Sequence, residues 1–369
     1  MTSYEDDSAT SLKHMFNADR FTHIAKAACS INSAFDGARF LQLATTSLDK
    51  RSIMQRLRQT AVSLETCLPG HFTQQLETLY ALAPKINHGF VSMILPEFVA
   101  LYGQDHFAES MDALKYFTQF GSSEFAVRHF LLKDMGRTLT TMQQWAEDEN
   151  DHVRRLASEG CRPRLPWSFQ IKALIEDPSP VASILQALKT DPALYVRKSV
   201  ANHLNDITKD HPEWVISLFS TWPEDNPHSQ WIIRHALRSL IKQGDQKALN
   251  LIGVAGKPDI DIIRFDVSPN QIALGDVIKL QVDIQSRSDN TQKLVIDYAI
   301  HYVKQNGKTS RKVFKLRTTE LAALGRLNLS SRQTIKDFTT RKHYAGKHIV
   351  ELIINGEMVT QQEFSLMTD

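Results

Sequence analysis

The sequence has few cysteines, no long apolar run and almost no net charge. Its three cysteines are odd in number and widely separated, which indicates neither a disulfide framework nor a metal site and favours a reducing compartment. The most apolar stretch, GFVSMILPEFVALY, contains Pro96 and Glu97 and is too short to span a bilayer. The first residues, MTSYEDDSAT, are polar and acidic, unlike a signal peptide. We therefore expect an intracellular soluble protein with no membrane contact.

The net charge does not identify a partner. Lysine and arginine number 43 against 41 aspartates and glutamates, which leaves a charge of +2. A surface for nucleic acid would therefore need a local cluster of cations. One such cluster is the segment DHVRRLASEGCRPRLPW, where Arg154, Arg155, Arg162 and Arg164 surround Glu159.

The spacing of apolar residues changes near Gly256-Lys257-Pro258. Up to about residue 255, apolar residues recur at three- and four-residue spacing, which predicts helices. After this point, seven short segments with strand-like alternation follow: IDIIRFDV, DVIKLQVDIQ, KLVIDYAIHYV, KVFKLRT, GRLNLSS, HIVELII and MVTQQEFSL. Seven such strands favour an immunoglobulin-like sandwich. We predict a mainly α chain, with a helical-repeat domain over residues 1–256 and a β-sandwich over residues 257–369.

Four helical segments share a β-branched residue followed by an arginine, at intervals of 26, 43 and 37 residues. The pairs are Val127-Arg128, Val153-Arg154, Val196-Arg197 and Ile233-Arg234. Uneven intervals fit degenerate helical-pair repeats, which stack and leave a concave face. Two roles fit the arginines, contact with a ligand and bridging between neighbouring repeats, and the pattern does not decide between them.

Glu159 lies in an unfavourable place for an acid. The segment DHVRRLASE is predicted to form a short helix, with Asn150 or Asp151 as the N-cap and Gly160 in the C′ position that ends it. A carboxylate in the last turn opposes the helix macrodipole, at a cost of up to about 1 kcal/mol. Such a break in a local rule indicates either a structural ion pair, with Arg155 as the partner, or a function.

The following loop and the neighbouring repeats add aromatic and acidic candidates. Pro163 and Pro166 stiffen the loop, and Trp167 suits either a sugar or base face or a plug in the core. Asp206 lies beside the polar face of the next helix, while Glu124 opens an earlier one, where an acid is favourable in any case. Carboxylates from three repeats can converge on the concave face. There they would stabilise the cationic sugar that forms when an N-glycosidic bond breaks.

These motifs resemble those of a known family. SEFAVRHFL, WAEDENDHVRRLASEGCRPRLPW and DPALYVRKSVANHLNDITKDHP are similar to signature segments of bacterial DNA alkylation repair glycosylases, and more narrowly to the AlkC branch of the HEAT-like-repeat glycosylases. The resemblance covers roughly residues 12–255. The strand-rich tail agrees with the Ig-like domain that members of this branch often carry. The resemblance therefore implies a HEAT-like helical-repeat solenoid followed by an Ig-like β-sandwich.

The resemblance also implies an activity. Members of this branch remove cationic N3-alkylated bases, notably N3-methyladenine and N3-methylcytosine, from duplex DNA without flipping the base. On the matching motifs it implies Glu159 as the carboxylate that faces the sugar, with Asp206 second and Glu124 third. Trp167 would lie near the lesion. The candidate phosphate contacts are Arg154, Arg155, Arg162, Arg164, Arg197 and Lys198.

The resemblance implies that the Ig-like domain closes around the duplex and contacts it through basic residues. The alternative is that these basic residues only form a solvated strand face. The candidate contacts of the domain are Lys308, Arg311, Lys312, Arg341 and Lys342. The resemblance implies no cofactor and no metal, and neither an HExxH motif nor a Walker or GxGxxG loop occurs. We expect a monomer of the bacterial cytoplasm whose partner is alkylated double-stranded DNA.

Two other functions stay open on the sequence. A catalytically weak relative that binds damaged or bent DNA would keep the arginines without needing Glu159 and Asp206. A helical-repeat scaffold for protein interaction predicts an apolar or acidic concave surface, which the arginine cluster argues against. Salt-dependent DNA binding separates the scaffold from the other two functions, because phosphate contacts give a steep salt dependence.

Overall fold

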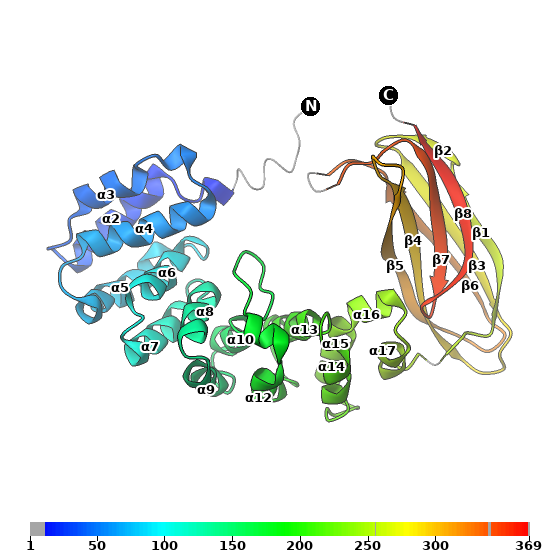
Figure 1. Cartoon of the computed structure of the whole chain (residues 1–369), viewed down its shortest axis with the longest axis horizontal. Helices are drawn as coiled ribbons and strands as arrows, with labels where there is room; N and C mark the ends of the chain where they lie inside the picture. The colour runs from blue at the N-terminus through cyan, green and yellow to red at the C-terminus, as the bar shows by residue number, and fades with distance from the viewer. Residues whose placement is uncertain (1–11, 255, 339–340, 368–369) are drawn as a thin grey trace. The chain divides into compact units, whose positions relative to one another are not determined.

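The computed structural model describes residues 12–254, 256–338 and 341–367, and the boundary between its two compact units lies between Ala236 and Leu237 (Figure 1). The first unit is helical, and the second combines two short helices with the strands. The predicted mainly α architecture with a C-terminal Ig-like sandwich is confirmed. The last helix ends at Leu251 and the first strand begins at Ile260, on either side of the expected boundary between residues 256 and 257, whereas the compact second unit begins at Leu237.

Helices of the first unit pack on one another in sequence along the chain. Their bounds are α2 Ala18–Ile31, α3 Gly37–Thr45, α4 Ile53–Cys67, α5 Phe72–Ile86, α6 Ile94–Tyr102, α7 Phe107–Phe117, α8 Glu124–Lys133, α9 Met135–Trp145, α10 Asp151–Glu159, α11 Lys172–Glu176, α12 Ala182–Ala187, α13 Leu194–Ile207, α14 Pro212–Phe219 and α15 Pro227–Ala236, with 3₁₀ helices η1 Leu48–Lys50, η2 Val91–Met93 and η3 Ser179–Val181. α4 packs on α6 and α6 on α8, while α10 packs on α13 and α13 on α15. α9 packs against α8, α10 and α12. This stacking of helical pairs is the HEAT-like arrangement that the family resemblance implies.

The helices of this stack bury one apolar stripe each. On α13 the stripe consists of Val196, Val200, Leu204 and Ile207, all of them buried, as the spacing predicts. The opposite side carries the exposed Lys198. Because the stripe faces the neighbouring repeats, polar residues at its margin contact the ends of two other helices. Ser199 contacts Glu159 at the end of α10, and Asn205 contacts the carbonyl of Ala236 at the end of α15. Within the described ranges, no helix is long and apolar enough to cross a membrane.

α10 begins and ends where the sequence predicts, but Gly160 has a different role. Asn150 caps the helix by accepting a hydrogen bond from the backbone N–H of His152. Gly160 is the C-cap and is right-handed, with φ −63° and ψ −34°, so the predicted C′ position is wrong. A Cβ on Gly160 would lie 2.5 Å from Cγ1 of Val127. The glycine is therefore needed because the end of α10 packs tightly against α8.

The second unit is a sandwich of two sheets. Its strands are β1 Ile260–Ser268, β2 Gln271–Ala273, β3 Val277–Ser286, β4 Gln292–Val303, β5 Thr309–Leu321, β6 Arg326–Thr334, β7 Gly346–Ile354 and β8 Glu357–Met367. One sheet has the order β1-β3-β6 and the other β2-β8-β7-β4-β5. The seven predicted strands are all present, whereas β2, a short strand parallel to β8, was missed. Alternate residues of β3 and β4, among them Leu280, Val282, Ile296 and Tyr298, fill the core between the sheets.

Two short helices, α16 Arg238–Gln243 and α17 Gln246–Leu251, belong to the sandwich rather than to the helical unit. Gly244, which ends α16 in the left-handed region, approaches Gly356 so closely that a Cβ would lie 2.6 Å from its carbonyl oxygen. After α17, Nζ of Lys293 on β4 donates to the carbonyl of Ile252 at 2.6 Å. These contacts explain why the compact unit starts before the first strand.

Candidate active site

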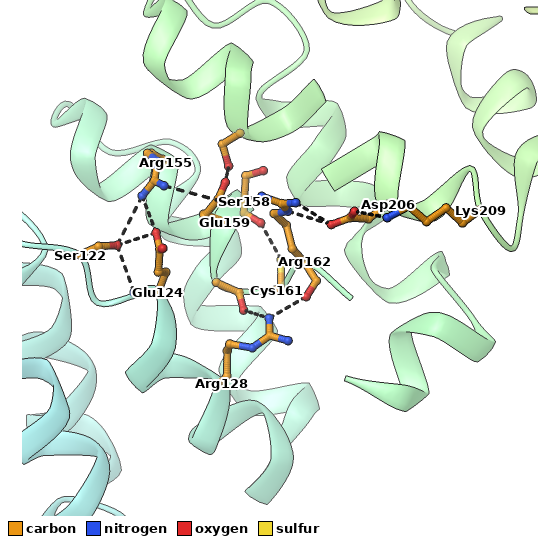
Figure 2. A network of polar contacts seen from close by, with 12 residues as sticks. Ser122, Glu124, Arg128, Arg155, Ser158, Glu159, Cys161, Arg162, Asp206 and Lys209 are labelled. Atoms are coloured by element: carbon orange, nitrogen blue, oxygen red, sulfur yellow. Dashed lines mark hydrogen bonds and ion pairs between the residues drawn. The ribbon is translucent and has the colours of Figure 1, made fainter. Parts of the chain in front are cut away.

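Arginines join the three predicted carboxylates into one network of alternating charge (Figure 2). Glu124 is the first residue of α8, Glu159 the last of α10, and Asp206 lies in the last turn of α13. Arg155 lies between Glu124 and Glu159, and Arg162 between Glu159 and Asp206. The structure therefore brings together acids from consecutive repeats, as the sequence pattern predicts.

Glu159 is held at both oxygens, and its residue is only 6% exposed. Its Oε1 accepts a hydrogen bond from Nη1 of Arg162 at 2.6 Å, and its Oε2 accepts one from Oγ of Ser199 at 2.5 Å. Nη2 of Arg155 lies 3.7 Å from Oε1. The predicted pair with Arg155 thus exists, but it is the loosest of the three contacts. The cation that offsets the unfavourable helix end comes mainly from Arg162 in the following loop.

Arg162 bridges two repeats. Its Nε and Nη2 lie 2.9 and 2.8 Å from Oδ2 of Asp206, whose Oδ1 accepts from Nζ of Lys209 at 3.0 Å. Burial alone would lower the pKa of Arg162, but Glu159 and Asp206 raise it above its ordinary value. The guanidinium therefore stays charged although it is buried, because a carboxylate lies on either side of it.

Arg155 makes the other bridge. Its Nη1 donates to Oε2 of Glu124 at 2.7 Å, and Oγ of Ser122 donates to the same oxygen at 2.7 Å. Its guanidinium carbon lies 4.9 Å from the centre of the Tyr195 ring, which is a cation–π contact. Burial lowers the pKa of Arg155, but the carboxylates of Glu124 and Glu159 raise it more, so the net shift is upward.

Arg154 and Arg197 hold the loops that precede their own helices. Nη1 of Arg154 donates to the carbonyls of Asp148 and Glu149, and its Nε donates to Oδ2 of Asp191 at 2.6 Å. Nη1 of Arg197 donates to the carbonyls of Asp191 and Pro192 at 2.7 Å each. In both repeats these carbonyls lie six and five residues before the arginine. In these two repeats, the arginine therefore holds the loop before its own helix, and Arg154 also pairs with Asp191 of the next repeat.

Arg128 is the buried member of the repeat pattern. Its Nη1 donates to the carbonyls of Gly160 at 3.0 Å and Arg162 at 2.6 Å. The side chain is completely buried, and burial lowers its pKa to about 10, so it remains charged at neutral pH. Of the two roles open to this arginine, the structure shows bridging between repeats. It fixes the backbone from which the Arg162 side chain extends.

Several candidates for DNA contact are more exposed. Trp167 is 62% exposed at a positive φ of 65°, so the alternative of a core plug is wrong. It lines a cavity of about 300 Å³ together with Phe125 and His129. Arg164 is partly exposed and pairs with Asp210 at 2.9 Å. Each of the four arginines that surround Glu159 in the sequence therefore has a carboxylate partner in the fold.

Of the candidate cations of the sandwich, Lys308, Arg311 and Lys312 lie at or directly before the start of β5, the strand at the end of the five-stranded sheet, and Arg341 and Lys342 lie between β6 and β7. Arg311 donates from Nε to Oε2 of Glu351 at 2.8 Å, while Lys308 and Lys342 are exposed. The charged groups of Lys312 and Arg341 lie 5.1 and 5.2 Å from the rings of Phe314 and Tyr302, respectively. Such cations also protect an edge strand from pairing with another chain.

Sequence reasoning missed Ser199, Ser122 and Tyr195. Ser199 is 2% exposed beside the buried stripe of α13. A small polar residue at that margin was the available signal, but its partner Glu159 is 40 residues away. No group of three or more histidine, cysteine or acidic side chains that could hold a metal ion occurs in the described part of the chain.

Family models match both units. The model for DNA alkylation repair enzymes matches residues 114–240, which include the whole carboxylate network. The model for the C-terminal Ig-like domain of the uncharacterised protein YhaZ matches residues 261–368. The first match covers the site, and the second covers the sandwich.

Two relatives match nearly the whole chain. The uncharacterized protein YhaZ of Bacillus subtilis (strain 168) is 40% identical over 356 residues, which are 96% of this chain and 99% of the relative. The alkylpurine DNA glycosylase AlkC of Pseudomonas fluorescens, solved with DNA containing an abasic site analog, is 53% identical. Its structure superposes with a TM-score of 0.94 over 96% of this chain and 99% of that chain.

Proposed function

This chain belongs to the DNA alkylation repair enzyme family, and we propose that it is a DNA glycosylase that hydrolyses the N-glycosidic bond of N3-alkylated bases in duplex DNA. The release of the base would begin base excision repair. One observation carries the proposal: the Glu159 carboxylate is buried and held at both oxygens within a network built from three repeats. The 53% identity to an alkylpurine DNA glycosylase supports the same reaction class.

The proposed reaction uses the carboxylates as fixed negative charges. As the N-glycosidic bond breaks, positive charge develops on the deoxyribose. Glu159 faces this sugar, stabilises the cation and orients the attacking water, with Asp206 and Glu124 behind it. Stabilisation of this kind is strongest when the charged groups are already in place and shielded from water. The hydrogen bonds from Arg162 and Ser199 provide that preorganisation.

The network favours cationic lesions, because it offers little to protonate a leaving base. Glu124, Glu159 and Asp206 each accept hydrogen bonds from an arginine. The adjacent His203 is fully buried, and burial lowers its pKa to about 3, so it is neutral at physiological pH. N3-methyladenine and N3-methylcytosine already carry a positive charge in DNA. Such bases leave without an acid, which fits a site whose three carboxylates all accept hydrogen bonds from arginines.

We further propose that the enzyme approaches the sugar from the backbone side of a bent duplex, without flipping the base into a pocket. Trp167 lies near the lesion, and its exposed ring supports this role. Exposed cations such as Lys198 neutralise phosphates directly. The remaining candidate phosphate contacts are arginines that already have partners in the fold. They bind phosphates through the N–H groups that those partners do not use: Arg154, Arg155, Arg162 and Arg164 of the cluster, and Arg197 of α13.

The sandwich adds affinity in this proposal. Its exposed edge bears candidate phosphate contacts at Lys308, Arg311, Lys312, Arg341 and Lys342. The protein acts as a monomer on one damaged duplex. Because phosphate contacts release counterions, the affinity for DNA should fall steeply with salt.

The test is release of base from duplexes that carry one defined lesion. We expect release of N3-methyladenine and N3-methylcytosine under single-turnover conditions, and no measurable release of hypoxanthine, a neutral base. Comparable release of hypoxanthine would contradict the argument from charge. Tight binding of the lesion duplex without any release would favour the alternative of a non-catalytic damage-binding protein.

A further inference from the structure

Ser199 makes a direct contact with the central carboxylate from another repeat. It lies on α13, is 2% exposed, and donates its hydroxyl hydrogen to Oε2 of Glu159 at 2.5 Å. Hydroxyl-to-carboxylate hydrogen bonds of about 2.5–2.7 Å are charge-assisted and among the stronger ones in proteins. This link therefore couples the repeat containing α13 to the end of α10 at the carboxylate itself.

The register of α13 explains how three residues reach the network together. Tyr195, Ser199 and Asp206 are separated by four and seven residues, a spacing that places them on one face of a helix. The Tyr195 ring contacts Arg155, and the Ser199 hydroxyl contacts Glu159. Asp206 lies at the opposite end of the network from Glu124 (Figure 2). One face of α13 therefore supports the whole network.

We propose that Ser199 is a positioning residue for Glu159, an inference that rests on the proposed glycosylase activity. The last torsion of a glutamate side chain is broad, so a carboxylate bonded at one oxygen can still rotate. Here Arg162 fixes Oε1 and Ser199 fixes Oε2, so the carboxylate plane is set from both sides. Each oxygen has a second lone pair, which leaves acceptor capacity for water or for a sugar C–H.

Ser158 provides a matched control. It directly precedes Glu159 on α10 and is buried, like Ser199, but its Oγ has no hydrogen-bond partner among the described residues. Changing either serine to alanine removes one buried hydroxyl. Only Ser199→Ala removes a hydrogen bond to the carboxylate, so the pair separates positioning from general packing.

The experiment measures single-turnover release of N3-methyladenine, affinity for DNA with an abasic site, and melting temperature, all on the full chain. We expect Ser199→Ala to slow base release roughly 10-fold, the size expected when one hydrogen bond to a charged group is removed. Its affinity for abasic DNA should stay within about 2-fold of wild type, since the carboxylate does not bind phosphate. Ser158→Ala should match the wild type, and Ser199→Thr, which restores a hydroxyl, should recover most of the rate.

A second variant guards against failure to fold. Ser199→Cys keeps the volume but replaces the hydroxyl by a weak donor, and it should show the same reduction in rate as Ser199→Ala. Wild-type rates for Ser199→Ala and Ser199→Cys would overturn the positioning role while leaving the glycosylase intact. An equal reduction in Ser158→Ala would overturn it as well. Absence of release by the wild type would instead overturn the proposed function on which this inference rests.

Discussion

Buried carboxylates occur in both units of the chain, but their surroundings differ. In the helical unit, Glu159 and Asp206 are 6% and 5% exposed and share the guanidinium of Arg162. In the sandwich, Asp297 of β4 is 4% exposed, and its Oδ1 has no hydrogen-bond partner within the described residues. Burial raises the pKa of Asp297 to about 6, even though Lys315 and Lys242 act to lower it.

The difference shows what a buried negative charge requires. A carboxylate stays charged without a large decrease in stability only if a cation and further donors replace the water around it. In the helical unit, Arg162 and Ser199 are the cation and the further donor for the buried acids. In the sandwich, Oδ1 of Asp297 has no hydrogen-bond donor among the described residues. We infer that the helical network is built to present charge, whereas Asp297 destabilises the folded state at neutral pH.

The largest effect should follow removal of the shared guanidinium. Arg162→Met leaves Glu159 and Asp206 buried beside each other without their common cation, and should lower the free energy of unfolding by about 3–5 kcal/mol. Arg164→Met removes a partly exposed ion pair with Asp210, and should lower the free energy of unfolding by at most about 1 kcal/mol. Urea unfolding of both variants checks this ranking. Equal decreases would mean that the network is no more than a surface ion pair.

Asp297→Asn should raise the free energy of unfolding at neutral pH, and the size of this increase should depend on pH. The folded-state pKa of about 6 lies above the ordinary value of 3.8, so the folded chain binds this proton more tightly between these values. Wild-type stability relative to the asparagine variant should therefore fall as the pH rises from about 4 to about 6, by roughly 2–3 kcal/mol in total, and then level off. Thermal unfolding at several pH values measures this difference. The exposed Asp289→Asn is the control and should show no such trend.

Removal of the exposed tryptophan should affect DNA rather than folding. The proposal places the Trp167 ring near the lesion, so Trp167→Ala should weaken binding of lesion-containing DNA roughly 10-fold, which corresponds to the lower part of the about 1–3 kcal/mol that one aromatic ring contributes to nucleic-acid binding. Its melting temperature should hardly change, because the side chain is 62% exposed. Leu132→Ala, which removes a similarly exposed apolar side chain from α8, should alter neither property. Unchanged affinity in Trp167→Ala would remove this residue from the proposed interface.

The smallest effects should come from single cations of the sandwich. Lys308→Gln and Lys342→Gln should each weaken DNA binding modestly and reduce the slope of log affinity against log salt by about 1 for each phosphate that the lysine neutralises. The rate of base release at saturating protein should not change. Lys347→Gln, whose lysine pairs with Glu363 away from β5, is the matched control. An unchanged slope in both test variants would favour the solvated strand face.

Sequence reasoning predicted the elements and the acids because both depend on local patterns. The two-residue period marks seven strands, and the three- and four-residue spacing marks the buried stripe of α13. β2 was missed because a three-residue strand is too short for a period to appear. Gly160 was misassigned because a glycine after a helix usually signals a left-handed turn, while here a contact with Val127 requires it.

Three contacts of the acids were beyond local patterns, although Glu159 also pairs with Arg155 and Arg162 close to it in sequence. Arg155 meets Glu124 across 31 residues, Arg162 meets Asp206 across 44, and Ser199 meets Glu159 across 40. These pairs depend on how successive repeats stack, which the uneven intervals of the repeat do not specify. The sequence therefore supports a convergence of acids, while the role of the arginines as their bridges emerges only from the fold.

The central claim is that Glu159 supplies the negative charge that makes base release fast. The most direct measurement is single-turnover release of N3-methyladenine by Glu159→Gln at saturating protein, with affinity for abasic DNA and melting temperature measured in parallel. We predict a rate roughly 100- to 1,000-fold below wild type, the range found when one preorganised electrostatic group is removed, with binding of abasic DNA retained. A wild-type rate in this variant, with the fold intact, would contradict the account and assign the chemistry to Asp206 or Glu124.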